Sequence, residues 1–215
     1  MYTESTIIDI KKLSEDLLNP SISQEHAEQI LNNIHSYFKE ITQVSGFDSD
    51  IKRLITLPAK NGMALSINHA AQCFLDYQRT TKFLRGTVQV IKDKLKENPN
   101  KKVHVFYAGC GPYAPFVTLV APLFSPDEVE FSLLEINKDS LEQAEVLIEN
   151  LGFTNYIKNC YLKDATEFKI PDADEVDILF SETLDALLYR ECYVPIMWNL
   201  IPQLNKDVKV IPENV

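Results

Sequence analysis

The chain has 215 residues, a length that supports one well-buried core more readily than two. Hydrophobic residues make up 45% and charged residues 24% of it, the composition of a soluble globular domain. Its formal net charge of −10 argues against nucleic acid as a partner, because phosphate binding requires a basic face. An acidic surface remains compatible with a cationic small molecule or a basic peptide.

The cysteines and the apolar runs indicate in which cellular compartment the protein is expected. Four cysteines stand at 73, 110, 160 and 192 without a CxxC pair, a spacing that supports neither a zinc site nor a disulfide framework. We therefore expect no metal and reduced thiols in a cytoplasmic protein. No basic segment followed by an apolar stretch opens the chain, and no run approaches the roughly 18 apolar residues of a membrane span. Neither secretion nor membrane association is predicted.

Helical periodicity dominates the first hundred residues. Apolar residues recur at three- and four-residue spacing over 7–18 and 24–44, and a third, short helix is predicted around 51–55. A polar loop at 58–62 then precedes a long helix, roughly 67–96, which ends before Asn98-Pro99. We assign residues 1–66 to an N-terminal helical region. This region either packs against the following domain or covers its site as a lid. The stretch 61–66, or the helices before it, is the candidate lid.

Short apolar runs alternate with helical patterns in the second half. Strands are predicted at 103–107, 129–135, 177–180 and 209–211, with a weaker candidate at 156–162 and a helix at 140–151. Such alternation indicates βαβ units. The predicted fold class is α/β, a Rossmann-like, mainly parallel sheet over residues 67–215 with the N-terminal helical extension. His104, Cys110 and Trp198 are interpreted as buried structural residues.

A glycine loop and two acidic residues lie where parallel sheets bind ligands, at the carboxyl ends of strands. The first strand runs into Gly109-Cys110-Gly111, where glycines allow close backbone approach. Glu135 ends the second strand, 24 residues after Gly111. A carboxylate at this position can accept hydrogen bonds from the two hydroxyls of a ribose. Asp164 follows the weak strand, where it could meet an adenine amino group. The alternative is an ordinary tight turn with a loop aspartate.

The segments 103–111, 133–135 and 162–165 resemble the motifs of class I methyltransferases. The resemblance implies S-adenosylmethionine as cofactor and S-adenosylhomocysteine as product. It places the cofactor against Tyr107, Gly109, Cys110, Gly111, Glu135, Asp164 and Ala165. Two positions depart from the pattern, since the family has an acidic residue at Tyr107 and a third glycine at Tyr113.

Two further segments resemble the protein arginine methyltransferases. Asp76, Arg79 and Thr80 match the helix before the family's first strand, which implies that Arg79 binds the cofactor's carboxylate. A planar guanidinium can grip a carboxylate with two hydrogen bonds, although a solvated helix face is the alternative. Glu182 and Glu191 stand nine residues apart, as the family's two glutamates do.

Two glutamates held together can clamp a cationic acceptor. Neighbouring carboxylates raise each other's pKa unless a cation lies between them, and a guanidinium presents paired donors in a fixed fork. Glu182 and Glu191 are therefore the predicted catalytic residues, Glu182 also adjoining the cofactor. The predicted function is S-adenosylmethionine-dependent N-methylation of a guanidino nitrogen of arginine or an arginine-like small molecule. Another methyl acceptor, a catalytically silent cofactor-binding domain, or ordinary surface glutamates remain alternatives.

The resemblance covers residues 70–215. The arginine methyltransferases continue into a β-barrel that has no counterpart here. We therefore expect either a fragment of a longer protein or a protein that works without the barrel. A further C-terminal domain or a homodimer is left open as partner, beside a small-molecule or basic peptide substrate. Asp185 is a further acidic candidate, and Arg190 beside Glu191 could form an internal ion pair.

Overall fold

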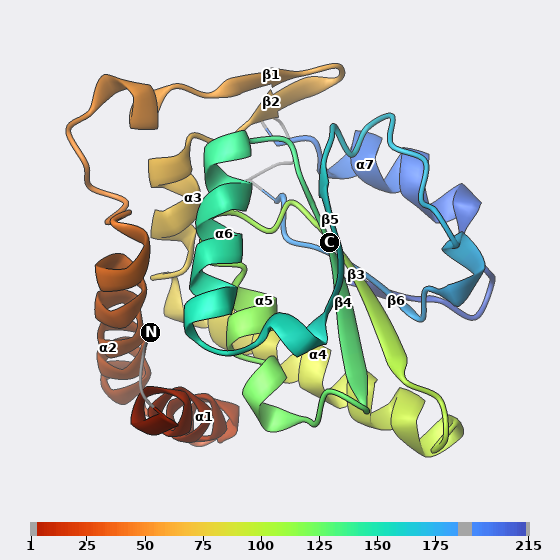
Figure 1. Cartoon of the computed structure of the whole chain (residues 1–215), viewed down its shortest axis with the longest axis horizontal. Helices are drawn as coiled ribbons and strands as arrows, with labels where there is room; N and C mark the ends of the chain where they lie inside the picture. The colour runs from red at the N-terminus through yellow and green to blue at the C-terminus, as the bar shows by residue number, and fades with distance from the viewer. Residues whose placement is uncertain (1–3, 185–190, 214–215) are drawn as a thin grey trace.

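A five-stranded sheet forms the centre of the molecule (Figure 1). The computed structural model describes residues 4–184 and 191–213. Its sheet strands are β3 (Val103–Ala108), β4 (Val129–Glu135), β5 (Ile157–Leu162), β6 (Ile178–Ser181) and β7 (Lys209–Ile211). They are ordered β5-β4-β3-β6-β7 and every pairing is parallel. The predicted α/β, Rossmann-like class is confirmed, including the weak strand at 156–162.

Helices cover both faces of this sheet (Figure 1). They are α1 (Glu4–Leu18), α2 (Gln24–Thr42), α3 (Ile67–Cys73), α4 (Tyr77–Glu97), α5 (Pro115–Thr118), α6 (Lys138–Asn150) and α7 (Tyr193–Leu200). Side chains alternate between faces along each strand. Val105 and Tyr107 belong to the core shared with α1–α6, whereas Phe106 and Ala108 belong to the core shared with α7.

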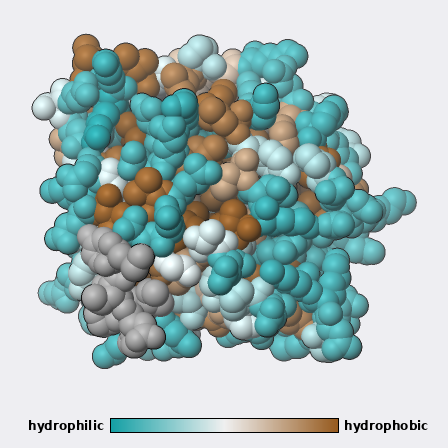
Figure 2. Space-filling view, viewed as in Figure 1, coloured by the Kyte–Doolittle hydropathy of each residue, from teal (hydrophilic) through white to brown (hydrophobic). Residues whose placement is uncertain are grey.

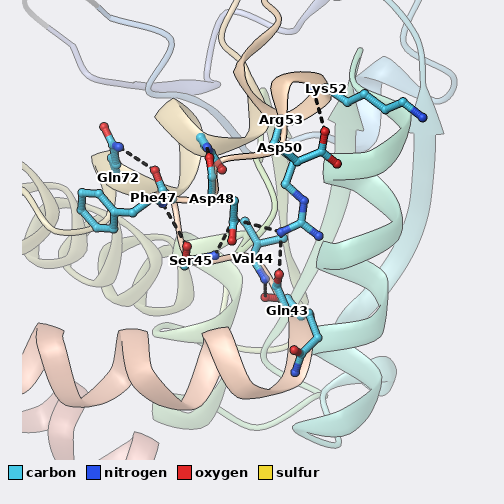
Figure 3. A network of polar contacts seen from close by, with 12 residues as sticks. Gln43, Val44, Ser45, Phe47, Asp48, Asp50, Lys52, Arg53 and Gln72 are labelled. Carbon is cyan, nitrogen blue, oxygen red and sulfur yellow. Dashed lines mark hydrogen bonds and ion pairs between the residues drawn. The ribbon is translucent and has the colours of Figure 1, made fainter.

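The N-terminal helices α1 and α2 pack onto the sheet's helical layer and add to its core. Ile34 and Phe38 of α2 are fully buried there. The segment that follows α2 is held by polar contacts (Figure 3). Asp48 accepts hydrogen bonds from the Ser45 N–H at 3.0 Å and from Arg53 Nη1 at 2.9 Å. This short network fixes the path of the chain from α2 toward the sheet.

A hairpin replaces the loop predicted at 58–62. Strands β1 (Leu57–Ala59) and β2 (Gly62–Ala64) pair antiparallel around a turn at Lys60-Asn61. The short helix predicted before it is a single 3-10 turn, η1 (Ile51–Leu54). Two strands of three residues have little stability alone. The local pattern at 57–64 contains no strand signal, because a contact with a residue far along the chain holds this hairpin.

The predicted long helix at 67–96 is wrong in one respect: it is two helices. The chain leaves α3 after Cys73 and restarts as α4 at Tyr77. Asp76 caps the second helix, its Oδ1 accepting the Arg79 N–H at 3.1 Å, because an aspartate favours the N-cap over a helix interior. The break brings Arg79 into the first turn of α4.

Trp198 is not a core residue, contrary to the prediction. It is 81% exposed on α7, where Val194 is also exposed while Ile196 and Leu200 are buried; Ile201, just after the helix, is exposed as well. A helix that packs against one face of a sheet buries one side only, and an apolar run does not reveal which side. His104 and Cys110 are buried as predicted.

The face of the molecule seen in Figure 2 carries mainly hydrophilic side chains, with smaller apolar patches between them.

Tyr113 connects the loop after β3 to the N-terminal segment. Its hydroxyl donates to the Val44 carbonyl, and its ring lies against Phe38 and Phe74 at centroid distances of 5.5 and 5.9 Å. We expect Tyr113→Phe to lower the free energy of unfolding by about 1–2 kcal/mol, because it strands a buried carbonyl. Urea unfolding measures the change. Coincident unfolding curves for variant and wild type would contradict a stabilising role for this bond.

Candidate functional site

A cavity lies at the carboxyl edge of the sheet. The ends of β3, β4, β5 and β6 contribute to its lining, together with α3, α4 and the β1–β2 hairpin. It brings together nine of the ten residues assigned to the site from the sequence. These lining residues are Arg79, Gly109, Cys110, Gly111, Glu135, Asp164, Ala165, Glu182 and Glu191; Tyr113 also lines the cavity. Open parallel sheets place ligands at this edge, where strand order reverses on either side of β3.

The glycine loop has the backbone conformation that requires glycine. Gly109 and Gly111 have φ of +76° and +63°, and Ala114 follows with φ of +39°. A Cβ on Gly109 would lie 2.5 Å from Thr183 Cγ2, so this loop touches the segment after β6. The loop therefore gives the cavity a floor of bare backbone.

The Glu135 carboxylate joins this loop to the end of β4. Its Oε2 accepts the Gly111 N–H at 2.8 Å, and its Oε1 accepts the N–H groups of Ile136 and Asn137 at 2.9 Å each. The side chain is only 7% exposed. Burial raises the pKa of this carboxyl, while the three N–H donors act in the opposite direction. Each oxygen keeps acceptor capacity for a ligand hydroxyl.

Asp164 holds the β1–β2 hairpin over the cavity. Its Oδ2 accepts the Lys60 N–H at 2.8 Å, and its Oδ1 accepts from the backbone and hydroxyl of Thr166 at 2.8 Å. Lys60 Nζ also pairs with Glu167 at 2.8 Å. Burial acts to raise the pKa of Asp164, but the donors from Lys60 and Thr166 outweigh it and lower the pKa. The hairpin then supplies Ala59, Met63 and Ala64 to the lining.

Arg79 grips the chain that follows β6. Its Nη1 donates to the Leu184 carbonyl at 3.2 Å, and its Nη2 donates to the Glu182 carbonyl. Its Nε lies 3.9 Å from Glu182 Oε2. The guanidinium is thus neither a solvated helix-face group nor aligned in a two-bond fork with a carboxylate; it positions the segment that carries Glu182.

Glu182 and Glu191 line the same cavity. The Glu182 side chain is 15% exposed and Glu191 is 9% exposed. Burial raises the pKa of Glu182 to about 7; Arg79 opposes the rise, while Glu191 and Asp76 add to it. Glu182 therefore changes charge near neutral pH. Asp185 and Arg190 lie outside the described residues.

Tyr107 lies beneath the cavity and does not line it. Its ring packs at 4.8 Å from Phe180 and 6.0 Å from Phe116, fully buried in the face that carries α4 and α5. Its position in a strand that is buried at every residue explains this placement. Cys110, the small residue of the loop, does line the cavity.

Sequence reasoning named the stretch 61–66 as a candidate lid, but it gave no role to Ala59, Cys73 or Thr183, which are among the lining residues. Thr183 stood next to a named glutamate, so its place was within reach. Cys73 is the last residue of α3, and the break that follows it at Phe74 was not predicted from the sequence. Among the described residues, no cluster of histidine, cysteine and carboxylates suits a metal ion, and no helix is long and apolar enough to cross a membrane.

Comparisons with known proteins find likenesses of structure but none of sequence. No protein-family model matches the chain, and no curated protein does. A mutant of MtNAS in complex with S-adenosylmethionine is 16% identical with a TM-score of 0.43, covering 96% of this chain and 74% of that one.

Two other solved structures match a smaller part of the chain. A methyltransferase from Thiobacillus denitrificans in complex with S-adenosyl-L-homocysteine is 15% identical with a TM-score of 0.38, covering 57% of this chain and 46% of that one. The cyclase SpnF is 13% identical with a TM-score of 0.39, covering 55% and 41%. The chain thus spans less than half of these last two proteins. Likenesses this distant assign no function to the chain.

We expect Gly109→Ala to destabilise the protein by about 2 kcal/mol or more, because a side chain at positive φ is strained and its Cβ would meet Thr183. The matched control is Gly86→Ala on the exposed side of α4, where an added Cβ meets nothing within 4 Å. This control should gain about 1 kcal/mol from helix propensity. Chemical denaturation of both variants checks the pair. Equal stability of the two would refute the close-packed loop.

Proposed function

We propose that this chain is an S-adenosylmethionine-dependent methyltransferase that acts on a guanidino nitrogen of arginine or of an arginine-like small molecule. The observation that carries the proposal is one cavity that unites a glycine loop, the buried Glu135 carboxylate and the pair Glu182 and Glu191. A nucleoside and a cationic acceptor can therefore be recognised side by side.

The residues present fit the cofactor's chemistry. Glu135 has free acceptor positions for ribose hydroxyls, and the bare backbone at Gly109 and Gly111 permits close approach. Asp164 retains acceptor capacity for an amino group, beside its bonds to Lys60 and Thr166. The positive charge of Arg79 supports binding of a carboxylate. When bound, S-adenosylmethionine supplies an electrophilic methyl group.

The glutamates suit a cationic acceptor. A guanidinium has five N–H donors in a planar fork, which match two carboxylates better than one. Glu182 and Glu191 would orient one terminal nitrogen and stabilise the positive charge that the acceptor carries. The methylated nitrogen must lose a proton, and Glu182 is the candidate to take it directly or through a water. The low exposure of both side chains strengthens these interactions, since little water screens them.

The cofactor proposal predicts a measurable affinity that depends on Glu135. Titration calorimetry of the whole chain should show binding of S-adenosylmethionine and S-adenosylhomocysteine. Glu135→Ala should lose at least about tenfold in affinity, because it removes the buried carboxylate that would accept charge-assisted hydrogen bonds from the ribose hydroxyls. The control is Glu142→Ala on α6, a solvent-exposed ion-pair residue whose change should leave affinity unaltered. Absence of binding to the wild type would overturn the methyltransferase proposal.

The acceptor proposal predicts methyl transfer to free arginine or a basic peptide, seen by mass spectrometry as a gain of one methylene. Glu182→Gln and Glu191→Gln should each reduce that transfer at least about a hundredfold, since the clamp loses a charge, while cofactor affinity stays nearly intact. Transfer to a hydroxyl or carboxyl acceptor alone would refute the guanidino assignment. Cofactor binding without transfer to any acceptor class would indicate a catalytically silent domain.

The transfer rate should also rise with pH. The Glu182 carboxyl has a pKa of about 7, so its acceptor-binding, ionised form is the minority below that pH and the majority above it. We expect the ascending limb of kcat/KM to have its midpoint near pH 7. The midpoint should vanish in Glu182→Gln. A rate that is flat between about pH 5 and pH 9 would contradict the role of Glu182.

A further inference from the structure

Two buried hydrogen-bond donors lie beside the cavity without a partner in the described part of the chain. They are the Tyr107 hydroxyl and the Arg79 Nε–H. A buried polar group that finds no partner loses its hydrogen bonds to water without replacement, which is unfavourable. Two such donors in one place therefore indicate an acceptor that is engaged in another protonation or ligand state of the protein.

The Tyr107 hydroxyl has a fixed position. The ring is wedged edge-on against Phe180, with an interplanar angle of 82°, and against Phe116 at 62°. A flip of the ring about its own axis leaves the oxygen in place, because the oxygen lies on that axis. Moving it would require repacking a strand that is buried on both faces. The acceptor must therefore come to the hydroxyl.

Glu182 is the candidate acceptor for both donors, because Tyr107 pairs with Phe180 in the parallel register of β3 and β6, two residues before Glu182. Its Oε2 lies 3.9 Å from Arg79 Nε, just beyond a hydrogen bond. Among the titratable neighbours, Glu182 has the largest effect on the pKa of Tyr107, ahead of Cys110, Arg79 and Glu135. Burial is the main cause of the high pKa of Tyr107, so the phenol keeps its proton and remains a donor.

We propose that Tyr107 is a positioning residue for Glu182: when Glu182 releases its proton to solvent, the Tyr107 hydroxyl and Arg79 Nε–H donate to its carboxylate and hold it at the cavity. The inference deepens the proposed function, because the ionised Glu182 is the group assigned to the acceptor. Position 107 suits a phenol, since a second carboxylate there would repel Glu182.

Several charges act on this unit. From α4, Arg79 favours the ionised carboxylate, while Asp76 at the helix N-cap disfavours it. From the segment before α7, Glu191 also disfavours it. From the loop after β3 and the end of β4, Cys110 and Glu135 influence Tyr107. A loss of the Tyr107 hydroxyl leaves all of these in place, so its effect can be isolated.

The first test is the titration of Glu182, followed by NMR of the whole chain with carboxyl-labelled glutamate and no ligand added. Glu182→Gln identifies the signal. The wild-type midpoint is expected near pH 7. Tyr107→Phe should move it upward by about one pH unit, the loss of one hydrogen bond to a charged group. Tyr113→Phe, whose hydroxyl is bonded to Val44, is the matched control and should leave the midpoint unchanged.

The second test compares unfolding free energies at about pH 5 and about pH 9. Glu182 has a folded pKa above its ordinary value, so its ionisation costs stability as pH rises toward 7. Without the Tyr107 donor that cost should grow. Tyr107→Phe should therefore match or exceed wild type at the lower pH and fall below it at the higher pH. Tyr113→Phe should lose stability equally at both.

An unchanged Glu182 midpoint in Tyr107→Phe would overturn the inference. So would an equal loss of stability at both pH values, which would make the hydroxyl a purely structural group. Neither measurement uses cofactor or acceptor. A protein that fails to bind S-adenosylmethionine but shows the shifted midpoint would retain the Tyr107–Glu182 unit and lose only the proposed function.

Discussion

The bond between the Glu135 carboxylate and the Gly111 N–H is the contact on which the rest of the site depends. It ties the loop after β3 to the end of β4, while Ile136 and Asn137 hold the other carboxylate oxygen. The two central strands therefore end in one fixed structure of backbone donors around a single charge. Parallel strands bring their carboxyl ends to one edge, so β5 and β6 deliver Asp164 and Glu182 to the same place.

The N-terminal segment is part of this site and does not merely lie beside it. Tyr113 bonds to Val44 after α2, and Asp164 bonds to the turn of the β1–β2 hairpin. The first contact fixes the glycine loop from outside, and the second places hairpin residues over the cavity. Loop and hairpin have little internal stability, so each is ordered by the residue that it contacts. Substitutions that break these contacts should therefore alter the position of the residues that line the cavity.

Charge burial sets the chemical character of the cavity. A protein of net charge −10 places two glutamates together at low exposure, with Arg79 as the cation at their edge. The terminal nitrogens of Arg79 donate to backbone carbonyls, so its positive charge offsets the negative charge of Glu182 only in part. Burial is the main cause that raises the pKa of Glu182 to about 7, and the partial compensation by Arg79 does not cancel it. An arrangement that costs stability in this way is typical of binding and catalytic sites.

The sequence by itself determined the sheet, the glycine loop and the acidic ends of its strands. Buried strands produce short apolar runs, and the residue that follows each run must lie at the sheet's edge, so Glu135 and Glu182 could be placed from local patterns. Only the tertiary structure decided the hairpin, the break before Arg79 and the exposure of Trp198. Lys60 meets Asp164 across 104 residues and Arg79 meets Glu182 across 103, and no local pattern encodes such contacts. The same reason applies to Tyr107, whose role depends on which strand ends beside it.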